Sequence, residues 1–183
     1  ALFGSDYHPG HFEVEMGLVT CLVFMGEHEK AIKRLEQLLS AQEDYAKRTH
    51  GLGTDVSQLG GGPPSSQIET EHFVDIEKRL SSPYHSMFCR MSYELKLAAV
   101  LYKEGHYEGC SHHLDEAIIL LDTSVFKGND NTLFDIEVST LQAKLDDVTS
   151  EGGEKTLALW SRVMSLKRNM YEKDDGEEVD THP

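Results

Sequence analysis

Three histidines and one cysteine lie within eight positions of the segment LYKEGHYEGCSHHLDEA, residues 101–117. On a helix, His106, Cys110 and His113 would be spaced at i, i+4 and i+7 and would share one face, with His112 beside it. Imidazole and thiolate are ligands that zinc favours, so the cluster could begin a metal site. A structural zinc site needs four ligands, however, and no CxxC or HxxxH motif elsewhere supplies the rest. We expect no metal and no cofactor, and we keep a helical regulatory or metal-binding domain using this cluster as an alternative.

The sequence lacks the usual signatures of a catalytic nucleophile or a phosphate-binding loop. No G-x-S-x-G elbow occurs, and no catalytic-cysteine signature surrounds Cys21, Cys89 or Cys110. The Gly-rich stretch at 51–66, GLGTDVSQLGGGPPSS, is not followed by the Lys-Ser/Thr pair that a phosphate-binding loop requires. We therefore expect a protein that is not an enzyme.

Composition narrows the class of partner. Seventeen Lys and Arg against 32 Asp and Glu give a net charge of −15 over 183 residues, which disfavours nucleic acid and anionic membranes. The longest apolar run, residues 14–25, is too short to span a bilayer, so we expect no membrane insertion. Three widely spaced cysteines are typical of buried thiols in a reducing compartment, and they predict a cytoplasmic protein. The chain begins without Met and ends at Thr-His-Pro, so we expect a piece of a longer protein.

Helical periodicity predicts an all-α chain built from helix hairpins. In the first helix, the residues that recur at helical spacing and predict its apolar stripe are Val14, Leu18, Cys21, Leu22 and Met25. No segment alternates apolar and polar residues as a half-buried strand would. The predicted organisation is a first hairpin at 1–50, a Gly/Pro-rich loop plus a short helix at 51–82, a second hairpin at 83–126, a degenerate third hairpin at 127–173, and an acidic tail or linker at 174–183.

Self-comparison of the chain reveals an internal repeat. A shift of 79 residues superposes six pairs, which are Leu18/Leu97, Leu22/Leu101, Gly26/Gly105, Glu29/Glu108, Ala31/Cys110 and Leu35/Leu114. Each unit has a helix, a turn with Gly, and a second helix with a small residue in its first turn. A small side chain there lets two antiparallel helices approach closely, and Gly closes the turn without a steric cost.

This pattern resembles the tetratricopeptide repeat. The matching repeat positions are Leu18, Gly26 and Ala31 in the first unit and Leu97, Gly105, Tyr107 and Cys110 in the second. The chain departs from the family at Val19, where Gly is preferred, and at Glu43 and Asp122, where a closing Pro is expected. A third copy at 134–171 is degraded, because Arg162 stands at a core position. His8-Pro9 and His182-Pro183 resemble the dipeptides that open the long repeats of the kinesin light chain type.

The resemblance implies hairpins stacked as a right-handed superhelical scaffold, with a concave groove lined by the first helix of each pair. By register, the partner-binding positions are Met16, Thr20, Val23, Leu95, Ala99, Tyr102 and Lys103. Where the family has the Lys and Asn clamp that grips a chaperone's terminal carboxylate, this chain has Met16, Thr20, Leu95 and Ala99, which cannot form it. The resemblance therefore implies a non-catalytic scaffold or adaptor that binds an apolar peptide or helix with basic flanks. A purely structural segment of a large complex is a further alternative, and the oligomeric state is left open.

Overall fold

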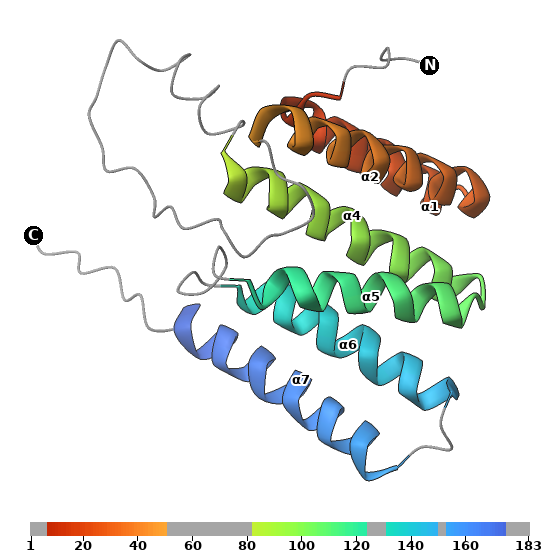
Figure 1. Cartoon of the computed structure of the whole chain (residues 1–183). Coiled ribbons are helices and arrows are strands. Elements are labelled where there is room, and N and C mark those ends of the chain that lie inside the picture. The colour runs from red at the N-terminus through yellow and green to blue at the C-terminus, as the bar shows by residue number, and fades with distance from the viewer. Residues whose placement is uncertain (1–6, 51–81, 124–130, 150–152, 175–183) are drawn as a thin grey trace, which may run out of the picture. The chain divides into compact units, whose positions relative to one another are not determined.

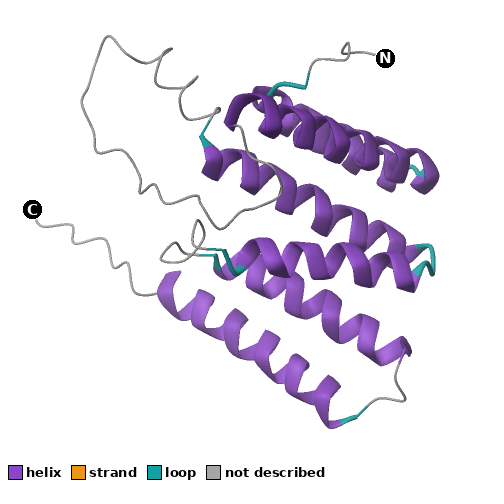
Figure 2. Cartoon of the chain, in the orientation of Figure 1, coloured by secondary structure: helices purple, strands orange, loops and turns teal. Residues whose placement is uncertain are grey.

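The computed structural model describes residues 7–50, 82–123, 131–149 and 153–174, and every regular element among them is a helix (Figures 1 and 2). After a 3-10 turn at Pro9–His11, the helices are α1 (Phe12–Phe24), α2 (His28–His50), α4 (Pro83–Lys103), α5 (Tyr107–Leu121), α6 (Thr132–Thr149) and α7 (Glu154–Asp174). The all-α prediction is thus confirmed for this part of the chain. The predicted loop and short helix within 51–81 and the acidic tail from 175 onward lie outside the described residues. None of the described helices is long and apolar enough to cross a membrane.

The chain divides into two compact units, residues 1–128 and 129–183. In the first unit, α1 pairs with α2, α4 pairs with α5, and α2 packs on α4 (Figure 1). One core joins the first hairpin to α4: Phe12, Val19 and Leu35 are buried together with Tyr93 and Leu97. The ring centroid of Phe12 lies 5.5 Å from that of Tyr93, so an aromatic contact links α1 directly to α4.

The two turns of the first unit repeat the same backbone structure. Gly26 and Gly105 have φ values of 74° and 76°, in the left-handed region that favours glycine. The amide of Glu27 donates to the carbonyl of Leu22 at 2.9 Å, and the same bond recurs 79 residues later at 2.9 Å, from His106. This is the helix-ending hydrogen bond of the Schellman motif. The sequence repeat therefore corresponds to a repeated structural turn.

The small residues of the repeat lie where the sequence predicts them. Ala31 and Cys110 are both fully buried. The residues one helical turn later, Leu35 and Leu114, are buried as well. A side chain larger than that of alanine or cysteine would separate the paired helices at this point, since protein interiors are close-packed. The predicted burial of these two small residues is confirmed.

Two repeat positions are exposed, and the sequence pattern predicts one of them, Leu18, on the buried side of its helix. Leu18 is 38% exposed, although its counterpart Leu97 is fully buried, and Val19 takes the interior place on α1 instead. Tyr107 is also exposed, at the start of α5. The difference at Leu18 arises because α4 lies between α2 and α5 and is covered on two sides, whereas α1 is covered mainly by α2 (Figure 1).

The second unit is a single antiparallel hairpin of α6 and α7. The hydroxyl of Thr156 donates to Asp146, and Arg162 lies 3.6 Å from Asp135 near the other end of the pair. The predicted third pair of helices is therefore present. Arg162 is not in the core, however, because it is exposed and the neighbouring Val163 is the buried residue.

Candidate partner-binding surface

The groove positions predicted on α1 lie on one side of that helix and are only partly accessible. Met16, Thr20 and Val23 are all half-buried, and Met16 and Val23 pack against the core of the first unit. The side chains of Met16 and Val23 therefore contribute to the stability of the hairpin and leave a reduced area for a partner.

The groove positions predicted on α4 fall into two groups. Leu95 is only 5% exposed, so it cannot line an open groove, and its assignment as a partner-binding residue is corrected. Ala99 and Tyr102 are half-buried and Lys103 is exposed. The ring centroid of Tyr102 lies 5.8 Å from that of Tyr107, which supports the Tyr102 ring from the start of α5.

The histidine and cysteine cluster does not converge on a common point. Cys110 is fully buried, and burial raises the pKa of its thiol to about 11, which keeps it protonated near neutral pH. His113 Nδ1 lies 2.7 Å from Glu94 Oε2, while His112 and His106 are exposed. Among the residues that the structure describes, no group of three or more His, Cys, Asp or Glu side chains is placed to hold a metal ion.

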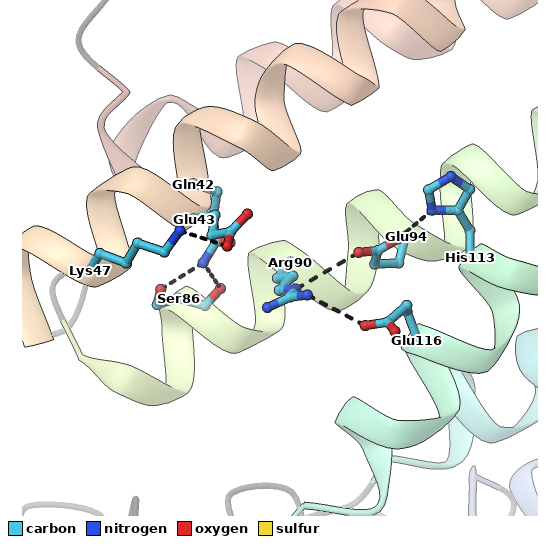
Figure 3. A network of polar contacts seen from close by, with 8 residues as sticks. All are labelled: Gln42, Glu43, Lys47, Ser86, Arg90, Glu94, His113 and Glu116. Carbon is cyan, nitrogen blue, oxygen red and sulfur yellow. Dashed lines mark hydrogen bonds and ion pairs between the residues drawn. The ribbon is translucent and has the colours of Figure 1, made fainter. Parts of the chain in front are cut away.

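His113 instead belongs to a polar network that joins α5 to α4 (Figure 3). The buried carboxylate of Glu94 contacts His113 on one side and lies 3.8 Å from Arg90 Nε on the other. Arg90 Nη2 lies 3.4 Å from Glu116 of α5. The Arg90 and Glu94 spacing of i, i+4 is a sequence signal for this ion pair, but the contribution of His113, 19 residues later, has no local signature.

A second polar pair holds α1 against α2. The Glu15 side chain is buried, and Arg34 donates to both of its carboxylate oxygens, from Nε at 2.9 Å and also from Nη2. Such a two-point contact between a guanidinium and a carboxylate is both strong and directional. Glu15 is therefore a structural residue of the buried side of α1.

The outward side of α1 is apolar and accessible, which the sequence pattern does not predict. Val14, Leu18, Cys21 and Met25 recur at i, i+4, i+7 and i+11, and they are all exposed, to 59% at Val14 and 66% at Met25. We call these four residues the α1 outer stripe. The sequence pattern assigned them to the buried side, but Phe12, Glu15 and Val19 occupy that side instead.

An open depression lies beside the start of α5. Ile32 of α2, Leu101 of α4, and Tyr107, Gly109 and His112 of α5 line it. The depression is broad and open to solvent, so it can receive a side chain of a bound protein but does not enclose a small molecule.

The chain was also compared with known proteins. It matches no protein-family model, no curated protein and no solved structure. The resemblance to the tetratricopeptide repeat therefore depends on the residues of this sequence.

Proposed function

We propose that this chain is a non-catalytic interaction scaffold of the tetratricopeptide kind, an adaptor segment that binds a peptide or helix across the first helices of its hairpins. The observation that carries the proposal is the repeat itself. The same glycine turn and the same small residue at the helix seam recur 79 residues apart, as in an array of stacked hairpins. Such arrays present one helix of each pair on a continuous surface, which is the surface they use for binding.

Four of the predicted groove residues leave area for a partner, namely Thr20, Ala99, Tyr102 and Lys103. Tyr102 is the favoured anchor because an aromatic ring supplies a large contact area and loses little conformational entropy on binding. The net charge of −15 favours a partner with basic flanks, since opposite charge speeds association. The three unpaired cysteines support an assignment to a reducing compartment, and we propose the cytoplasm.

The test is a binding measurement with two labelled peptides, one apolar with Lys and Arg flanks and one ending in an acidic carboxylate. We expect the basic-flanked peptide to bind more tightly, and added salt to slow its association. Tyr102→Ala should weaken that binding roughly tenfold, as the loss of an aromatic anchor does. Tyr171→Ala is the matched control, since Tyr171 is an exposed tyrosine of the second unit.

The opposite pattern would refute the proposal. If only the acidic peptide binds at micromolar concentration, and if Tyr102→Ala leaves that binding unchanged, the groove assignment is wrong.

A further inference from the structure

Helix α1 is apolar on two opposite sides. Phe12 and Val19 are buried against the rest of the first unit, whereas the α1 outer stripe faces solvent. Phe24, beside the stripe, is 89% exposed. A helix that is apolar all round is normally covered all round, and a contiguous exposed apolar surface marks an interaction site.

The geometry of the stripe fits a helix as its occupant. The spacing of Val14, Leu18, Cys21 and Met25 is 4, 3 and 4 residues, which is the spacing of a seam between two packed helices. At a rise of 1.5 Å per residue, the stripe is about 16 Å long, or three helical turns. A partner helix of three to four turns would cover it.

The charges around the stripe are acidic. Residues 7–29 contain four Glu and no Lys or Arg. Glu15 is buried against Arg34, but Glu13 is exposed near one end of the stripe, and Glu27 and Glu29 follow the other end. Lys30 is the first cation after the stripe, and it pairs with Glu27 at 3.0 Å. A partner with basic residues at both ends of its apolar seam is complementary to this surface.

These charges disfavour a second copy of the chain as the occupant. If two copies of α1 paired in antiparallel fashion about the middle of the stripe, Glu13 of one copy would face Gly26 and Glu27 of the other. A parallel pairing would place Glu13 against Glu13. Each copy also carries a net charge of −15, so carboxylates would gather at both ends of the seam in either case.

We propose that the α1 outer stripe docks an amphipathic helix of a partner protein, with an apolar seam at 3–4 spacing and Lys or Arg at its flanks. This surface is separate from the groove of the proposed function, because it lies on the opposite side of α1 from Met16, Thr20 and Val23. The inference therefore stands independently of that groove.

Cys21 offers a direct measurement of occupancy. It is exposed in the middle of the stripe, whereas Cys89 and Cys110 are fully buried. A thiol reagent at neutral pH will therefore modify Cys21 of the folded chain selectively. The probe is a designed helical peptide of about three heptads, with a Leu seam and Lys flanks. We expect saturating peptide to slow Cys21 modification at least tenfold.

Two peptides and three variants make the test specific. A peptide of the same composition with a scrambled seam should leave Cys21 unprotected, and a peptide with Glu flanks should bind at least tenfold more weakly. Leu18→Ser should weaken binding of the Lys-flanked peptide roughly tenfold, as measured by fluorescence anisotropy. Ile119→Ser and Leu157→Ser, at exposed apolar positions of α5 and α7, should both bind as the parent chain does.

Several outcomes would overturn the proposal. Equal protection by the scrambled peptide would mean that charge alone drives binding, and unchanged binding by Leu18→Ser would place the contact elsewhere. Concentration-dependent protection of Cys21 without peptide, accompanied by dimers in sedimentation velocity, would identify a second copy as the occupant.

Discussion

The backbone conformation of the two hairpin turns can be tested by replacing glycine with alanine. Alanine should destabilise the chain at the turn glycines and stabilise it at a glycine inside helix α1. Gly26 and Gly105 have left-handed φ values of 74° and 76°, and a Cβ atom at either position would meet no other atom within 4 Å. The cost of alanine there is therefore conformational and not steric. Gly17 is the matched control, because it lies inside helix α1 and a Cβ atom would also meet nothing within 4 Å.

The magnitudes follow from the backbone alone. A left-handed conformation costs an L-residue about 1–2 kcal/mol, and alanine recovers about 0.4–1 kcal/mol by restricting the unfolded chain. Gly26→Ala and Gly105→Ala should therefore each lower the free energy of unfolding by about 1 kcal/mol. Gly17→Ala should raise it by about 0.5–1 kcal/mol, because glycine is a poor residue for a helix interior. Asparagine tolerates the left-handed region, so Gly26→Asn should lower the free energy of unfolding by less than Gly26→Ala does.

The assay is urea denaturation followed by far-ultraviolet circular dichroism, with thermal melting as a second measurement. For a chain of 183 residues, 1 kcal/mol corresponds to a shift of about 2–4 °C in Tm. The two turn variants should shift by similar amounts, since the turns have the same geometry. If all three alanine variants shift in one direction, or if the turn variants are as stable as the parent chain, the left-handed backbone at Gly26 and Gly105 does not determine their stability.

Three further predictions concern packing, buried charge and pH. Ala31→Leu and Cys110→Leu should each lose about 1–3 kcal/mol of unfolding free energy through overpacking at the helix seams, and unchanged urea midpoints would contradict the repeat register. Glu15→Ala should lower the free energy of unfolding by about 1.5–3 kcal/mol, because it removes the charged partner of Arg34. A double-mutant cycle with Arg34→Ala should give a coupling energy well above zero. Burial raises the pKa of Cys89 to about 12 and that of Cys110 to about 11, so the folded chain retains protons that the unfolded chain releases above about pH 9. The free energy of unfolding should therefore fall between about pH 9 and 11, by up to about 1.4 kcal/mol per pH unit for each thiol. Cys110→Ala should make the free energy of unfolding fall less steeply with pH. An unchanged pH dependence in this variant would contradict the burial of Cys110.

The features that could be predicted from the sequence are those that demand one residue type. A left-handed turn favours glycine and a close helix seam requires a small side chain, so the roles of Gly26, Gly105, Ala31 and Cys110 could be predicted from the sequence repeat. The helical class follows equally directly from the 3.6-residue period of the apolar positions.

The orientation of α1 could not be predicted, because both of its sides are apolar. Periodicity chooses a buried side only when the other side is polar, and here the stripe from Val14 to Met25 competes with the side that carries Phe12 and Val19. The buried side also contains Glu15, whose carboxylate is acceptable there only because Arg34 pairs with it. That pairing joins residues on two helices and has no local signature. Leu95 was misplaced for a related reason, since the register fixes its helix but does not say which sides of that helix are covered.

Helices α2 and α4 are joined at two separated points, and this has a mechanical consequence. His28, at the start of α2, hydrogen bonds Glu104 just after α4, while Gln42 Nε2 donates to the Ser86 carbonyl at 3.0 Å near the start of α4 (Figure 3). The two attachments are 14 residues apart on α2, or about 21 Å along its axis. A force that slides one hairpin past the other acts on both hydrogen-bonded contacts at the same time. A force that pulls the helices apart at one end acts first on the contact at that end and only afterwards on the other. Under tension, the two hairpins should therefore resist sliding as one rigid body and yield more readily to peeling from one end.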